Sequence, residues 1–95
     1  MREQEIEQKL VRTVRQMGGL APKFTSPGMA GVPDRLILLP GGRVFFAEVK
    51  ALGKQLRPLQ KRRKAQLEQL GFRVYVIDNP AAIAGMIQEI GGDKE

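Results

Sequence analysis

The chain has 95 residues and a net charge of +6, and 42% of its residues are hydrophobic; we expect one compact domain over residues 1–95 with one modest core. It contains neither cysteine nor histidine, which excludes disulfide scaffolding, structural zinc sites, cysteine nucleophiles and imidazole bases. No signal peptide and no apolar run of transmembrane length is apparent, so we expect a cytoplasmic protein without a membrane partner.

The first third of the chain predicts a helix followed by irregular structure. Apolar residues recur at helical spacing from Ile6 to Met17, and Gly18-Gly19 follows them, so we expect a helix over 3–17. Residues 20–25 are compatible with a short edge strand. The glycines and the proline of residues 26–31 predict a loop.

Two strand-like runs follow, over residues 34–39 and 43–50, and Pro40-Gly41-Gly42 separates them. Proline has no N–H to donate to a ladder hydrogen bond, so a three-residue turn is favoured over a two-residue one. We expect Pro40 at the second position of a type I turn, with Gly42 in the left-handed conformation. This turn pairs Leu39 with Arg43.

The predicted register brings two carboxylates together. Asp34 and Glu48 each lie five residues from the turn pair, so they face each other with Cβ atoms ~5 Å apart. Lys50 points to the same face of the sheet. Two unpaired like charges would destabilise the hairpin, and a divalent cation between them would reverse the sign of that interaction.

An ordinary surface arrangement is the alternative to a metal site. Glu48 and Lys50 would then be a solvated pair, and Asp34 a strand-start residue after Pro33. The hairpin spacing, the apolar strand and the basic stretch that follows favour the metal site. Carboxylates without softer ligands favour a hard cation, Mg²⁺ or Mn²⁺.

The charge excess lies in the segment that leads into the second helix. Seven cations and no acid occur from Lys50 to Lys64, a pattern that favours binding to a phosphate backbone. An acidic protein or membrane surface would also attract this segment, and a solvated basic helix face would have the same sequence. We expect the helix over 57–70, with an apolar stripe of Leu59, Leu67 and Leu70 that also contains Arg63.

A strand over 72–77 and a final helix complete the chain. Asn79 is expected to cap that helix, with Pro80 at its first position, and its buried face is expected to contain Ile83, Ile87 and Ile90. The order α-β-β-β-α-β-α indicates one α/β domain built on a small mixed sheet.

These residues resemble a known nuclease signature. Pro33-Asp34, thirteen further residues and then Glu48-Val49-Lys50 resemble the motif of PD-(D/E)XK nucleases. The longer string "GVPDRLILLPGGRVFFAEVK…LRPLQ" resembles the VRR-NUC (virus-type replication-repair nuclease) subfamily, and the resemblance covers nearly the whole chain. It implies a restriction-endonuclease-like αβββαβ core, a mixed β-sheet flanked by helices.

The resemblance also implies roles for the central residues. Asp34 and Glu48 would bind one or two Mg²⁺ (or Mn²⁺) ions, and the backbone carbonyl of Val49 would add a ligand. Lys50 would orient or help to deprotonate the attacking water and offset charge on the phosphate.

Two further residues are implied to belong to the site. Gln60 matches a glutamine typical of the subfamily, which would lie beside the carboxylates. The family also has an acid on the first helix. Among Glu3, Glu5 and Glu7 we choose Glu7, as a catalytic residue and metal ligand, because its distance to Gly18 resembles that in archaeal Holliday-junction resolvases.

The expected function is that of a Mg²⁺-dependent endonuclease acting on branched DNA, a four-way (Holliday) junction, without a small-molecule cofactor. Paired nicks need two active sites, so we expect a homodimer with contacts from the last helix or residues 20–29. Phage or prophage origin in a bacterial host is expected. Flanking phosphates would be held by five cations: Lys54, Arg57, Lys61, Arg62 and Lys64.

Three alternatives remain open on the sequence alone. The chain could be a nuclease for flaps, nicks or ends that works beside a viral helicase. It could be a basic DNA-binding module that does not cut. It could also be an adaptor that binds RNA or an acidic protein, in which case changing Asp34 would leave function intact.

Overall fold

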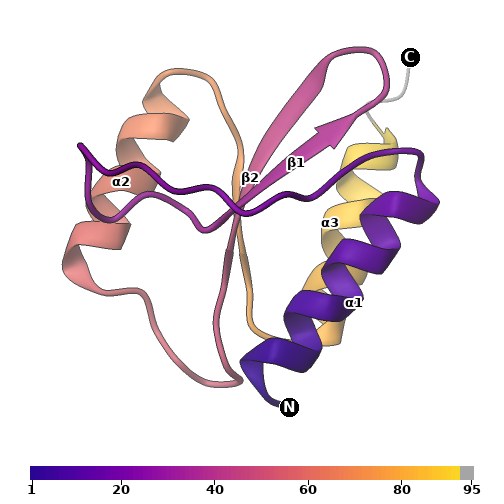
Figure 1. The fold of residues 1–95 in the computed structure, drawn as a ribbon, viewed down its shortest axis with the longest axis horizontal. Coiled ribbons are helices and arrows are strands. Elements are labelled where there is room, and N and C mark those ends of the chain that lie inside the picture. Colours follow the sequence, from indigo (N-terminus) through magenta and orange to yellow (C-terminus); the bar gives the residue numbers. More distant parts are fainter. Residues whose placement is uncertain (93–95) are drawn as a thin grey trace.

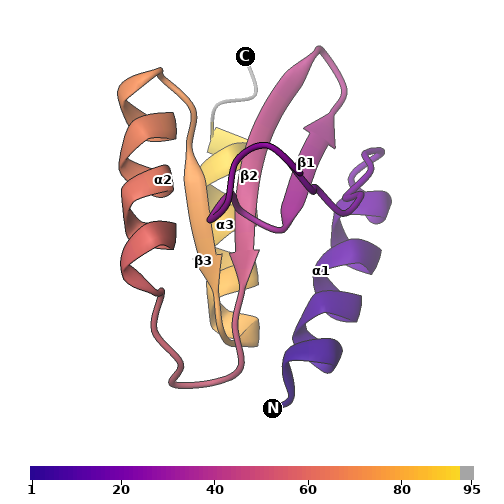
Figure 2. The same ribbon diagram turned by 60° about the vertical axis from the view of Figure 1, so that its left-hand side comes forward.

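The fold is a mixed sheet between two layers of helices (Figures 1 and 2). The computed structural model describes residues 1–92. Its elements are α1 (Glu3–Gln16), β1 (Arg35–Leu39), β2 (Arg43–Val49), α2 (Pro58–Gln69), β3 (Val74–Ile77) and α3 (Pro80–Gly92). The sheet order is β1-β2-β3; β1 is antiparallel to β2, and β2 is parallel to β3. None of the helices in residues 1–92 is both long and apolar enough to cross a membrane.

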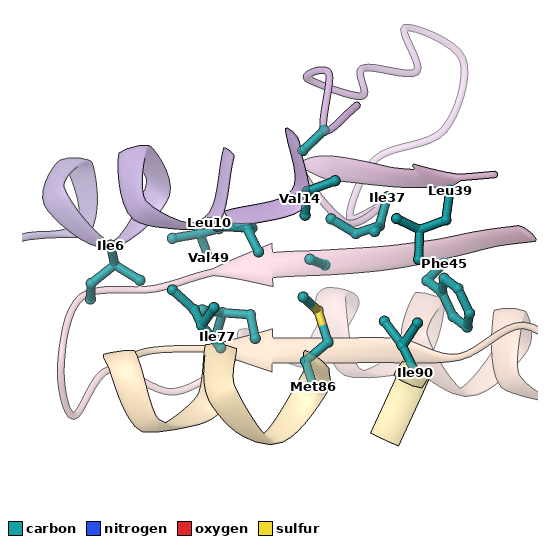
Figure 3. Packing of buried hydrophobic residues seen from close by; sticks show 13 residues of the cluster. Ile6, Leu10, Val14, Ile37, Leu39, Phe45, Val49, Ile77, Met86 and Ile90 are labelled. Carbon is teal, nitrogen blue, oxygen red and sulfur yellow. The ribbon is translucent and has the colours of Figure 1, made fainter. Parts of the chain in front are cut away.

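The core lies on the face of the sheet that α1 and α3 cover (Figure 3). Alternate residues of the strands point to this face, including Ile37 of β1 and Val49 of β2. Met86 is 2% exposed, whereas the expected Ile87 is only partly buried. Asn79 caps α3 as predicted, because its Oδ1 accepts the N–H of Ala82 at 2.9 Å.

The opposite face is covered by α2, which has no buried residue. The predicted apolar stripe is wrong at its end, because Leu70 is 74% exposed. Arg63, the charged residue of that stripe, makes a polar contact instead: its Nε donates to the carbonyl of Ala30 at 2.8 Å. A polar contact to the 26–31 loop therefore helps to hold α2.

The segment over residues 20–24 is not a regular strand, although it lies beside β1. Isolated bridges join Leu20 to Leu38 and Lys23 to Arg35. Between them Pro22 accepts the N–H of Leu36 but has no N–H to return. The predicted edge strand is therefore present as an interrupted pairing, and three strands form the sheet.

The hairpin turn has the predicted register and a different turn type. Leu39 pairs with Arg43. Gly42 has a positive φ of 73°, as expected, but Gly41 also has a positive φ, of 85°. A type I turn needs a negative φ at Gly41, so that prediction is wrong; proline followed by a positive φ is typical of a type II turn.

Candidate active site

Asp34 and Glu48 lie at the end of the hairpin away from its turn. The ladder extends to Arg35 opposite Ala47, so the next step places Asp34 opposite Glu48 on the face that α2 covers. Oδ1 of Asp34 accepts the N–H of Val49 at 3.2 Å. Glu48 is 6% exposed and is the buried charged residue of the described chain. The fold therefore brings together the two carboxylates that the sequence paired.

Burial and nearby carboxylates make Asp34 and Glu48 weaker acids than usual. The pKa of Glu48 is raised to about 7, first by burial and then by the charge of Asp34, while Lys50 opposes the shift. Burial also raises the pKa of Asp34, against the N–H of Val49, which lowers it. A pair that resists carrying two negative charges is one that a bound cation would stabilise.

Lys50 and Gln60 both approach Glu48. Nζ of Lys50 is 3.8 Å from Oε2 of Glu48, and Nε2 of Gln60 donates to the same oxygen at 3.0 Å. Oε1 of Gln60 accepts the N–H of Arg57 at 2.8 Å, in the first turn of α2. This cap fixes the amide with its nitrogen toward Glu48, so the start of α2 orients the Glu48 carboxylate.

Glu7 lies near the pair but is already bound to an arginine. Nε and Nη2 of Arg35 both donate to its Oε2, at 3.1 and 2.8 Å. Its Oε1 accepts no hydrogen bond within the described chain, and its charge still raises the pKa of Asp34. Within residues 1–92 no three acidic side chains are grouped to hold one metal ion.

Two further charged residues influence the carboxylate pair. Glu3, one of the three candidates for the first-helix acid, raises the pKa of both Asp34 and Glu48, whereas Glu7 raises that of Asp34. Its spacing of four residues from Glu7, on one helix face, was the available signal. Arg35 was not among the predicted site residues. The sequence signal that could have indicated it was a cation at a core-facing position of an apolar strand.

Four of the five predicted DNA-contacting cations are exposed: Lys54, Arg57, Lys61 and Arg62. They lie in the loop before α2 and along the first half of α2. Lys64 is partly buried, and its Nζ forms an ion pair with Glu68 at 2.9 Å. The structure therefore offers four free cations and one compensated cation on this surface.

Comparisons with known proteins agree with this arrangement. A phage protein named "Putative nuclease p44", from Acyrthosiphon pisum secondary endosymbiont phage 1, is 51% identical over 79 residues, which span 83% of this chain and 85% of the relative. A solved structure described as a "VRR_NUC domain" superposes with a TM-score of 0.87 at 27% identity, covering 93% of this chain and 96% of that one. No protein-family model matches the chain.

Proposed function

Because the chain belongs to the VRR-NUC family of nucleases, we propose that it is a Mg²⁺- or Mn²⁺-dependent endonuclease that hydrolyses phosphodiester bonds in branched DNA. The observation that carries this proposal is the pair of buried carboxylates. Asp34 and Glu48 face each other beside Lys50 and carry raised pKa values, as expected for a site that binds a divalent ion.

The residues around the pair have separate tasks in this mechanism. Asp34 and Glu48 would bind the metal, with the carbonyl of Val49 as a further ligand, and Glu7 would join them after its side chain moves closer, because no three acids are grouped within residues 1–92. Bound Mg²⁺, one or two ions per site, would polarise the scissile phosphate, activate water and stabilise the leaving 3′ oxygen. The ammonium of Lys50 offsets phosphate charge and orients the attacking water, and Gln60 holds Glu48 in position.

Glu7 remains available for this role despite its ion pair. Both Arg35 nitrogens donate to Oε2, so Oε1 is left to approach a metal ion. Arg35 would then serve the site by holding the carboxylate in place.

Binding to DNA is proposed to use shape rather than sequence. Exposed cations along the loop before α2 and along α2 itself would contact phosphates, which position the protein without reading bases. A four-way junction has two strands to cut, and each chain carries one carboxylate pair, so a two-fold dimer would supply both sites.

Exposed apolar side chains support one of the two expected dimer contacts. Leu20 and Met29 are exposed, by 58% and 48%, whereas Ile83 and Ile90 of α3 are buried in the core. We therefore place the dimer contact at residues 20–29 rather than on α3. The phage relative supports a phage origin, and we propose that the enzyme acts in the cytoplasm of a bacterial host.

Cleavage of a labelled four-way junction tests the proposal. Matched duplex, flap and single-stranded substrates are compared with Mg²⁺ or EDTA, using wild type, Lys50→Ala and the exposed-lysine control Lys9→Ala. We expect paired symmetric nicks in the junction, lost with EDTA and in Lys50→Ala but retained in Lys9→Ala. Equal cutting by Lys50→Ala would overturn the catalytic assignment. Tight junction binding without cutting would favour a DNA-binding module, and preferred cutting of flaps or ends would favour the helicase-associated nuclease.

A further inference from the structure

A second cationic surface lies on the other side of β1 from α2. A cavity of about 380 Å³ opens between α1 and the 20–24 segment. Its polar lining comprises Gln4, Glu7, Gln8, Arg12, Lys23 and Arg35. These residues are spread over a third of the chain, so the sequence shows no cluster of charge there, and the fold alone creates it.

The lining has the character of an anion site. Arg35 is compensated by Glu7, and its Nη1 donates to the carbonyl of Ala21 at 2.8 Å. That leaves Arg12 and Lys23, which are exposed and take part in no ion pair within residues 1–92. Gln4 and Gln8 add neutral amide donors on the same side of α1.

This surface begins next to the carboxylate pair. Lys23 lies opposite Arg35 in an isolated bridge, and Arg35 directly follows Asp34. The next residue of the segment, Phe24, donates its N–H to the carbonyl of Asp34 at 2.8 Å. The helix α1, which lines the pocket, and the helix α2 lie on opposite sides of the strands (Figure 2), so the pocket and the cations of α2 approach the carboxylate pair from two sides.

We propose that Arg12 and Lys23 bind a backbone phosphate of the DNA substrate, on the side of the carboxylate pair away from α2. This inference rests on the proposed function, since it takes DNA as the ligand. The strand would be held on both sides of the bond to be cut, which fixes the scissile phosphate over Asp34 and Glu48.

Salt-dependent DNA binding in EDTA tests the inference. The double variant Arg12→Ala/Lys23→Ala is compared with wild type and with Lys9→Glu, which removes the same two units of charge from an exposed position of α1 outside the pocket. We expect the double variant to bind duplex and junction on the order of tenfold more weakly, with a salt slope smaller by about 1, because the one phosphate contact that the two cations share is lost. Lys9→Glu should keep the wild-type slope.

A small substrate separates this role from catalysis. With Mg²⁺, the double variant should cut DNA more slowly but hydrolyse bis(p-nitrophenyl) phosphate at the wild-type rate, since that molecule is too short to reach the pocket. If the double variant keeps the salt slope of wild type while wild type cuts DNA normally, this inference is overturned and the proposed function stands. Wild type that binds but never cuts overturns the proposed catalysis, while a reduced slope still supports the pocket. Absence of DNA binding by wild type overturns both.

Discussion

At the level of single residues, the environment of Glu48 suits a bound metal ion but disfavours the charged carboxylate in the metal-free protein. It is buried on a sheet face beside a second carboxylate, and Lys50 and Gln60 only partly compensate it. The folded protein therefore favours the protonated form of Glu48, whose pKa is raised to about 7. The features that suit Glu48 to a metal ion thus reduce the stability of the metal-free protein at neutral pH.

Replacing Glu48 with glutamine should stabilise the metal-free protein at pH 8. Because the pKa is higher in the folded than in the unfolded chain, this group's favourable contribution is full below the unfolded value of about 4.5 and is lost as pH rises through about 7. At pH 8 we expect the unfolding free energy of Glu48→Gln to exceed that of wild type by on the order of 2–3 kcal/mol, so the variant should unfold at a higher temperature. At pH 4 we expect no such difference. Thermal unfolding in EDTA measures this difference, and cleavage should be abolished.

Mg²⁺ provides the matching control for Glu48→Gln. At pH 8 it should raise the unfolding temperature of wild type and leave that of the variant unchanged. A variant that is less stable than wild type at pH 8 would show that the charge of Glu48 does not destabilise the metal-free fold. A variant that Mg²⁺ stabilises as much as wild type would show that Glu48 is not a metal ligand.

The roles of Glu7 and Glu3 can be distinguished by measuring the unfolding free energy and the Mg²⁺ requirement of cleavage for a variant of each. Glu7→Gln removes the partner of Arg35, whose side chain is 13% exposed, so we expect a loss of about 1–3 kcal/mol in unfolding free energy. It should also raise the Mg²⁺ concentration needed for half-maximal cleavage. Glu3→Gln, on the exposed first turn of α1, should change neither stability nor metal requirement by much. If Glu3→Gln alone raises the Mg²⁺ requirement, Glu3 is the first-helix acid.

At the level of elements, the sequence predicted what local chemistry determines. The hairpin register followed from Pro40 and its glycines, and the start of α3 followed from Asn79. It did not predict contacts between segments far apart in the chain. The pair of Arg35 with Glu7 joins a strand to a helix 28 residues away, and no local pattern encodes that distance. The interruption at Pro22 was readable in principle, because proline cannot complete a ladder.

The position of α2 depends on close packing at Gly31 rather than on a buried apolar stripe. Gly31 has a positive φ of 83°, and an added Cβ would lie 2.7 Å from Cγ of Leu59. We expect Gly31→Ala to destabilise the protein by about 2 kcal/mol and to lower cleavage further by displacing Gln60, one residue from Leu59. Gly28→Ala, where an added Cβ meets nothing within 4 Å, is the matched control. Denaturant unfolding and cleavage rates measure both effects; equal behaviour of the two variants would contradict this account.

At the level of the whole molecule, two cationic surfaces lie near the carboxylate pair. The cations of α2 were visible in the sequence as one run, whereas Arg12 and Lys23 come together only after folding. The carboxylate pair lies between these surfaces, so the positive field would attract a phosphate backbone toward the metal site.

The proposed dimer makes a prediction for the whole molecule through Leu20. Its side chain is 58% exposed, while its backbone N–H and carbonyl bond to Leu38, so Leu20→Lys should leave the fold intact. Placing a charge in the contact should raise the dimer dissociation constant at least tenfold. Leu52→Lys, at a residue 60% exposed in the loop before α2, should not affect it. Sedimentation measures both, and nicking of a four-way junction provides the functional result.

Loss of the dimer should separate the two nicks rather than abolish cutting. Each chain keeps its own Asp34 and Glu48, so a monomer can still hydrolyse one strand, but the second nick then requires a new encounter with the junction. We expect Leu20→Lys to accumulate singly nicked junctions at protein concentrations where wild type yields resolved duplexes. Wild type that sediments as a monomer and still makes paired nicks would refute the dimer. A dimer unaffected by Leu20→Lys would place its contact elsewhere than residues 20–29.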